Sequence, residues 1–286
     1  MLKLTITKED FEFVLPVFQS PTAHLFERLT HEIEVATEEV HALVSDTADG
    51  SDAEADVTRH AIAYICCVSA RRVLPQLDLV LTETGFGVVG NGNIVPASQA
   101  RVSALNDSLR QKASQAWDNL LFTLLRTPWR ENDVAVGHVS SLVWLPTLCR
   151  RYGITASKEV GNRILPMPVY DEEFDALRSS LAVAEAKVAT MISPELYDFL
   201  VEQERTSQEA PTTAVALLIE RSRRLIGALM KEDTHPRSVA PLSKRLLETV
   251  EQYREDLPQY TSSRTYAARQ IPAYENKKED AIFFFS

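Results

Sequence analysis

The sequence has few residues of the kinds that build disulfide scaffolds, thiolate metal sites or membrane spans. It contains three cysteines in 286 residues, and Cys66 and Cys67 are adjacent while Cys149 is distant. This spacing gives neither a disulfide framework nor a CxxC pair, so we expect reduced, buried thiols. No apolar run approaches the roughly 20 residues that a membrane helix needs. The first residues show no signal-peptide pattern, and we therefore expect a cytoplasmic protein with no membrane partner.

Basic residues are outnumbered by acidic ones. The chain has 30 lysines and arginines against 40 aspartates and glutamates, a formal net charge of -10. Such a chain repels phosphate backbones and anionic lipid. Its small basic group at Arg221, Arg223 and Arg224 is flanked by acids such as Glu220. We therefore expect no sequence-specific binding of nucleic acid.

Hydrophobic residues make up 45% of the chain, which is enough for one large domain or two small ones. They recur at intervals of three and four residues, the spacing that lines one face of a helix. Segments with this spacing, or with a serine-proline helix start, are 20–43, 57–75, 98–127, 174–191, 193 onwards, 212–231 and 241–255. The pattern predicts a mainly α protein, a helical bundle in two halves.

The predicted halves are separated by an irregular stretch. Residues 1–127 form the N-terminal helical half, and residues 171–286 form the C-terminal helical half. Between them, residues 128–170 are interrupted by prolines and glycines, which indicates a connector. Within the first half, residues 79–95 alternate like strands and contain the tight-turn dipeptide Asn91-Gly92, which predicts a β-hairpin insertion.

Both ends of the chain read as short terminal strands. Residues 2–7 alternate polar and apolar side chains, and residues 281–285 end in three phenylalanines. An exposed run of this kind is costly unless another surface covers it. The C-terminal strand can pair with the N-terminal strand of the same molecule or add to a neighbouring subunit. The sequence leaves both arrangements open.

One glycine motif fits the dinucleotide-binding fingerprint GxGxxG formally. It runs from Gly85 to Gly90 after a strand-like segment. In that fingerprint the glycines open a helix whose N-terminus faces a pyrophosphate. Here Asn91-Gly92 follows, and the sequence turns and extends again through Pro96. We expect these glycines to shape a bent hairpin and to bind no cofactor.

A metal site is suggested only weakly. Glu38 and His41 have the three-residue spacing that carboxylate-bridged di-iron bundles use, but such a site needs the pair twice. The other match, Glu232 and His235, runs directly into Pro236. The sequence also lacks the GxSxG, HExxH and Walker motifs. We therefore expect no metal site and no catalytic residues.

The most distinctive segment lies between two predicted helices. It reads LDLVLTETGFGVV over residues 77–89 and NIVPASQARV over residues 93–102. This segment resembles an uncharacterised protein family found in Bacteroides prophages and related elements, whose members carry an LTxxGFGVV…N…PAS…RV signature. The tail, from Tyr274 to Phe285, is a weaker match. The resemblance covers about 40 residues and brings no catalytic residues with it.

What this resemblance implies is a structural protein of a phage-like particle. Head–tail connectors and adaptors near the portal are small helical bundles that assemble into rings, so the implied partners are further copies of the chain and other phage structural proteins such as a portal. We expect the hairpin and the tail to make the subunit contacts, through Phe86, Val88, Val89, Ile94, Ile282, Phe283, Phe284 and Phe285. Two alternatives stay open: a helical-bundle enzyme or metal-binding protein, and an intracellular regulatory binding module.

Overall fold

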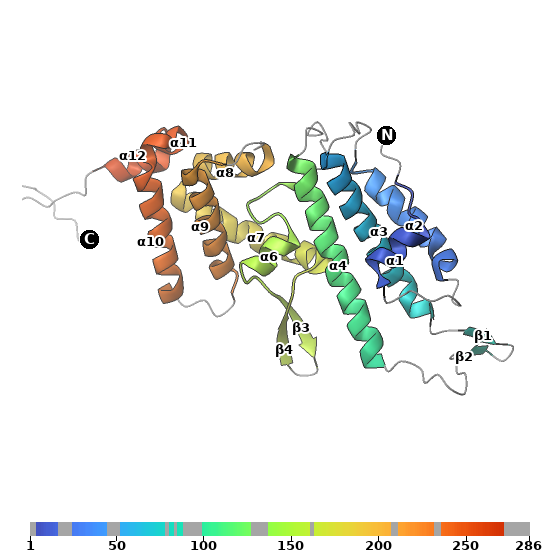
Figure 1. The fold of residues 1–286 in the computed structure, drawn as a ribbon. Coiled ribbons are helices and arrows are strands. Elements are labelled where there is room, and N and C mark those ends of the chain that lie inside the picture. Colours follow the sequence, from blue (N-terminus) through green and yellow to red (C-terminus); the bar gives the residue numbers. More distant parts are fainter. Residues whose placement is uncertain are drawn as a thin grey trace, which may run out of the picture. The chain divides into compact units, whose positions relative to one another are not determined.

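The protein is a mainly α helical bundle with a β-hairpin insertion (Figure 1). The computed structural model describes residues 4–16, 25–44, 52–77, 80–82, 85–87, 99–126, 137–160, 163–206, 211–231 and 236–271.

Helices and short strands follow one another along the chain. In order they are α1 Lys8–Val14, α2 Leu25–His41, α3 Asp52–Leu77, β1 Val80–Thr82, β2 Gly85–Gly87, α4 Gln99–Arg126, α6 Pro146–Arg151, β3 Ala156–Val160, β4 Arg163–Met167, α7 Asp171–Ile192, α8 Pro194–Thr206, α9 Thr213–Leu229, α10 Pro236–Gln252, η2 Arg254–Asp256, α11 Pro258–Thr261 and α12 Arg264–Gln270. The long helices predicted from the apolar spacing are confirmed, with ends that shift by a few residues.

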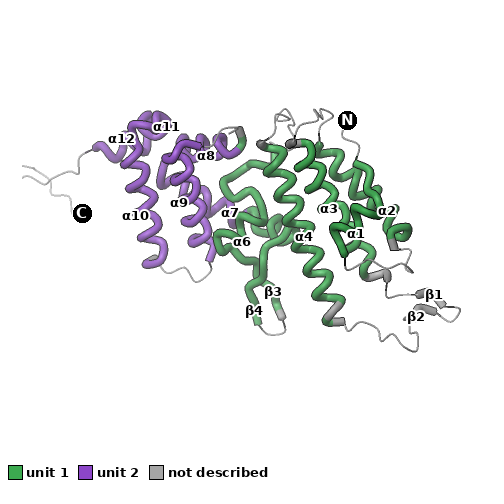
Figure 2. The backbone as a smooth tube through the Cα atoms, viewed as in Figure 1, with its two compact units in different colours: residues 1–178, 205–210 green, residues 179–204, 211–286 purple. Residues whose placement is uncertain are grey.

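The chain divides into two compact units, coloured separately in Figure 2. The first unit comprises Met1–Arg178 and Arg205–Ala210, and the second comprises Ser179–Glu204 and Pro211–Ser286. The division falls inside α7. The described residues of the predicted connector, 137–160 and 163–170, belong to the first unit.

The first unit is built around α3, which packs against α4, α2 and α1. Residues 65–70 of α3 are all buried. This agrees with its sequence, which is apolar on several faces, as in a helix surrounded by others. The neighbouring helices each present one apolar stripe, with Ile33 and Val40 of α2 and Leu109 and Leu120 of α4 buried. The burial of these stripes therefore follows the predicted spacing.

The N-terminal strand predicted over residues 2–7 is not formed by its described part, residues 4–7. Instead, Thr7 caps α1: its hydroxyl accepts a hydrogen bond from the backbone N–H of Asp10, and the Asp10 carboxylate accepts one from the backbone N–H of Thr7. This reciprocal pair satisfies backbone donors at the start of the helix. The cap thus fixes the start of α1 directly after residues 4–7, whose alternating polar and apolar side chains had favoured a strand.

Two antiparallel hairpins interrupt the helices of the first unit. Strands β1 and β2 pair with Leu81 opposite Phe86, so a hairpin lies within the predicted range 79–95, but its strands are separated by residues 83–84 and not by the predicted turn Asn91-Gly92. Residues 88–95 of that prediction lie outside the described residues. Strands β3 and β4 pair over five positions, from Ala156 opposite Met167 to Val160 opposite Arg163. This second hairpin falls in the stretch that the sequence analysis assigned to an irregular connector.

The second unit packs α9 against α10. Leu218 and Leu246, one from each helix, are fully buried. Arg223 of α9 pairs with Glu204 of α8 at 2.8 Å, and Tyr260 of α11 has no exposed surface. This unit is therefore held by an apolar helix interface together with a mostly buried ion pair.

Candidate functional site

The predicted contact residues lie largely outside the described part of the chain. Phe86 is in β2, opposite Leu81 in the ladder. Val88, Val89, Ile94 and the four tail residues, Ile282, Phe283, Phe284 and Phe285, all fall outside the described residues. The role predicted for these residues in subunit contacts stays a prediction.

The glycine motif begins within a strand. Gly85 and Gly87 belong to β2, where they pair with Thr82 and Val80. The next described helix, α4, starts at Gln99. Neither of these two glycines therefore opens a helix in the way that a dinucleotide fingerprint requires.

Glu38 and His41 lie near the end of α2. Across the described residues, no group of three or more histidine, cysteine, aspartate or glutamate side chains is placed to hold a metal ion. His235 and its glutamate lie outside the described residues. The structure therefore supplies no further ligands to the Glu38/His41 pair from the described part of the chain.

The three cysteines are buried free thiols, as the sequence predicted. Burial raises the pKa of the Cys66 thiol to about 12 and that of Cys67 to about 11. Because the thiolate is the nucleophile, a raised pKa makes these cysteines poor candidates for covalent catalysis.

We expect the native protein to react slowly with Ellman's reagent at pH 8. A rise in pKa from 9.0 to about 11 lowers the thiolate fraction of Cys67 by about 100-fold, and Cys149 is fully buried as well. The absorbance of the released thionitrobenzoate should rise at full rate only after urea is added. Rapid release of one equivalent or more without urea would show that a thiol is accessible.

A buried polar cluster in the first unit joins α4 to α6. Asp118 of α4 has no exposed surface, and its Oδ2 accepts hydrogen bonds from the backbone N–H and the hydroxyl of Thr147. Thr147 is in the first turn of α6, whose own N-cap residue, Leu145, offers no side-chain acceptor. Asp118 thus caps α6 from another helix, satisfying a donor that the start of a helix leaves open.

Arg150 extends this cluster to the segment before α7. Its Nη2 lies 3.5 Å from Asp118 Oδ2, and its Nη1 donates to the backbone carbonyl of Val169 at 2.6 Å. The guanidinium groups of Arg110 and Arg150 both lie over the Tyr170 ring, 4.7 and 5.2 Å from its centroid. Both distances are within the range of favourable cation–π contacts. The cluster therefore holds α4, α6 and the start of α7 together.

The other side of this cluster is an ion pair. Arg110 donates to both oxygens of Glu173, at 2.7 and 2.8 Å. Partial burial alone would raise the pKa of Glu173, but the hydrogen bonds from Arg110 and from the backbone N–H of Tyr170 lower it. Each arginine therefore has an acidic neighbour, and the cluster offers no unopposed positive charge for a phosphate group.

Asp118 is the most perturbed carboxylate of this cluster. Burial raises its pKa to about 6, against the lowering effects of Thr147 and Arg150. Its Oδ1 makes no hydrogen bond with the described residues. A perturbed acid is a common mark of an active site, but Asp118 is sealed from solvent and acts as a helix cap. The contacts of Asp118 therefore support a role for this residue in holding α6 in place.

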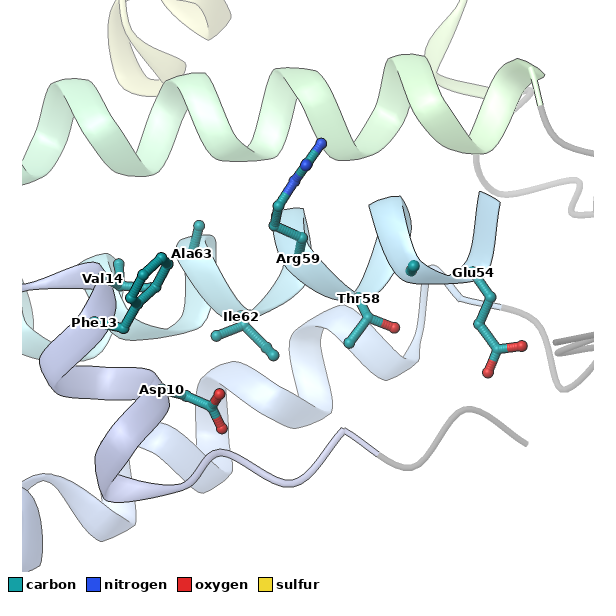
Figure 3. Close-up of a pocket in the computed structure, with 9 residues that line it drawn as sticks. Asp10, Phe13, Val14, Glu54, Thr58, Arg59, Ile62 and Ala63 are labelled. Atoms are coloured by element: carbon teal, nitrogen blue, oxygen red, sulfur yellow. The ribbon is translucent and has the colours of Figure 1, made fainter. Parts of the chain in front are cut away.

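A groove of about 670 Å³ lies between α1 and α3 (Figure 3). It is lined by Asp10, Phe13, Val14, Glu54, Ala55, Thr58, Arg59, Ile62 and Ala63. Two of its charged groups are already engaged, because Asp10 caps α1 and Arg59 pairs with Asp56 at 3.0 Å. The groove has the size and apolar lining of a small-molecule site.

The β3–β4 hairpin is an exposed feature of the first unit. Figure 1 shows it projecting beyond the end of α6. Residues 157–159 and 163–166 are all exposed, including the apolar Ile164 at 65% and Leu165 at 46%. An isolated two-stranded hairpin is marginally stable in water unless something packs on it. Its exposed apolar residues and free edges are therefore typical of a contact surface.

The β3–β4 hairpin was not predicted from the sequence. The signal was the dipeptide Gly161-Asn162, which is typical of a two-residue hairpin turn and separates the segments that become β3 and β4. The polar composition of β3, with Lys158 and Glu159 at its centre, hid the alternation that marks a half-buried strand.

Within the described ranges, no helix is both long enough and apolar enough to span a bilayer. No curated protein sequence and no solved structure matches the chain significantly. Residues 25–134, which include α2, α3, the β1–β2 hairpin and α4, match the model of a family described as a family of unknown function, DUF6712.

Proposed function

We propose that this protein is a structural subunit of a larger assembly, and specifically a ring-forming head–tail connector or adaptor of a phage-like particle. Its partners in this proposal are further copies of itself and another structural protein of the particle, such as a portal. It is made in the cytoplasm and is incorporated into the particle there.

The observation that carries the proposal is the β3–β4 hairpin. Ile164 and Leu165 are neighbours in β4 and therefore point to opposite faces of the hairpin, and both side chains are exposed. The likeness of residues 77–102 to the prophage family supports the more specific connector role. The polar cluster around Asp118 supports the structural role, because its charged groups connect α4 to α6 and to the start of α7.

Self-assembly should be visible by light scattering after size exclusion, followed by negative-stain images of the main peak. A subunit of a ring forms particles of defined mass whose population grows with protein concentration. A protein that stays monomeric at high concentration, both alone and with a portal protein, would contradict the proposal.

The hairpin should be required for this assembly. Replacing both Ile164 and Leu165 with serine removes two apolar side chains from the contact, and each is worth about 1.5 kcal/mol or more when buried. We expect the dissociation constant to rise at least about tenfold. Val183→Ser is the matched control, because Val183 is an equally exposed apolar residue of α7, at 58%. Equal effects of the two changes would show that the hairpin has no special role.

A further inference from the structure

The two faces of the β3–β4 hairpin differ in charge. Residues that pair directly across an antiparallel ladder share a face, and so do residues two positions apart in one strand. Lys158 is opposite Leu165, and Arg163 is two positions from Leu165. One face of the hairpin therefore carries Lys158, Arg163, Leu165, Ala156 and Met167. We name this surface the basic-apolar face.

The basic-apolar face has positive charge without a partner in the described chain. Lys158 and Arg163 are exposed, and neither forms an ion pair with the described residues. The acid of the hairpin, Glu159, is opposite Ile164 and thus belongs to the other face. Two cations beside the exposed Leu165 are suited to a partner segment that is acidic and apolar.

The edge of β3 is open to a further strand. Within the described residues the sheet has two strands, so β3 pairs there with β4 on one side only. All five residues of β3 carry a backbone N–H, whereas β4 contains Pro166, which does not. A strand that adds to a sheet edge bonds to these backbone groups and is selected by its side chains. The β3 edge is the better acceptor for such a strand.

The chain itself contains a segment of the required chemistry. Residues 272–286 follow the last described helix, and within them Glu279 and Asp280 directly precede the apolar run 281–285. This order of two acids and then apolar residues complements the two cations and the apolar residues of the basic-apolar face. Fifteen extended residues reach up to roughly 50 Å, which is far enough to extend to another molecule.

We propose that residues 279–285 of a second copy of the chain add as a third strand to the free edge of β3. Because adjacent residues of a strand point to opposite faces, one of the two acids, Glu279 or Asp280, lies on the basic-apolar face beside Lys158 of the neighbouring strand, and alternate apolar residues of the tail lie on the face that carries Leu165. This inference rests on the proposed function, because it supplies the contact between subunits. The hairpin and the tail are two different surfaces of one chain, and a contact between unlike surfaces generates rings when the rotation between copies closes.

Charge exchange tests the proposal on the full-length protein. One variant, K158E/R163E, makes the hairpin acidic like the wild-type tail, and another, E279K/D280K, makes the tail basic like the wild-type hairpin. Each variant alone should assemble about tenfold more weakly than the wild type, as measured by light scattering across a concentration series. An equimolar mixture should recover assembly, because each tail then meets a hairpin of opposite charge on the other variant. The fourfold variant should also recover it.

A control separates these pairings from net charge alone. Lys187→Glu with Arg264→Glu changes two exposed cations that lie outside the hairpin, and this variant should assemble like the wild type. Unchanged circular dichroism and melting temperature should show that the substitutions leave the fold intact.

The outcomes distinguish the inference from the function on which it rests. If the wild type assembles and every variant assembles equally well, the strand exchange is wrong and the assembly uses another surface. A wild type that is monomeric under all conditions overturns the proposed function. Variants that fail alone and fail as a mixture, while the fourfold variant recovers, would indicate that the tail pairs within its own molecule, which overturns the proposal of a second copy.

Discussion

Replacing Phe11 with alanine should lower the free energy of unfolding of the first unit by about 3–5 kcal/mol. Phe11 is 2% exposed and is the buried residue through which α1 is anchored. Its ring meets Phe26 of α2 edge to face, with centroids 6.1 Å apart, a geometry that adds to the energy of apolar burial. Alanine would remove this contact and leave a cavity beneath a helix of one to two turns.

The matched control is Phe13→Ala on the same helix. Phe13 is two residues further on and is 86% exposed, so its removal should change stability by no more than about 0.5 kcal/mol. All three tryptophans, Trp117, Trp129 and Trp144, belong to the first unit. Their fluorescence during urea unfolding therefore reports on this unit alone. Similar losses for the two variants would show that α1 is not anchored by Phe11.

The long helices could be predicted because their signals are local. The α4 helix shows why: a proline and serine directly precede its start, an apolar stripe runs along it, and Pro128 follows its end. Such signals depend only on residues within a few positions of each other. The burial of Leu109 and Leu120 followed from the same stripe.

The elements that were not predicted are short, or their local sequence favours two kinds of structure. Residues 4–7 alternate like a strand, yet the cap formed by Thr7 and Asp10 starts a helix there. That cap is itself readable as a threonine followed three residues later by an acid. The β3–β4 hairpin lacks a buried face, so the alternation that usually marks a strand has no reason to be present.

The polar cluster could not be predicted from one sequence. Asp118 and Thr147 are 29 residues apart, and Arg110 and Glu173 are 63 apart. Nothing in the local pattern around Asp118 distinguishes it from a solvated aspartate on a helix face. Its burial depends on how α6 packs against α4, which is a property of the tertiary fold.

Asp118→Asn should remove a pH dependence from the stability of the first unit. Burial raises the pKa of Asp118 from 3.8 to about 6 in the folded protein. As the pH rises through this window, the unfolded chain releases its proton first, so the free energy of unfolding falls. A difference of about two pKa units corresponds to about 3 kcal/mol in the free energy of unfolding. The folded protein has this contribution to its stability below about pH 4 and has lost it above about pH 6. About half of this change falls between pH 5 and pH 8.

Asparagine is uncharged throughout this range and keeps an oxygen that can accept the hydrogen bonds of Thr147. The free energy of unfolding of the wild type minus that of the variant should therefore fall by about 1.4 kcal/mol from pH 5 to pH 8. Tryptophan fluorescence during urea unfolding at several pH values would measure it, and taking the difference removes the titration of groups that do not interact with Asp118. Asp107→Asn, an exposed change on the same helix, should give a flat difference. A flat difference for Asp118→Asn as well would mean that the carboxylate capping α6 is hydrated in the folded protein, and the charged cap would then cost the fold little at neutral pH.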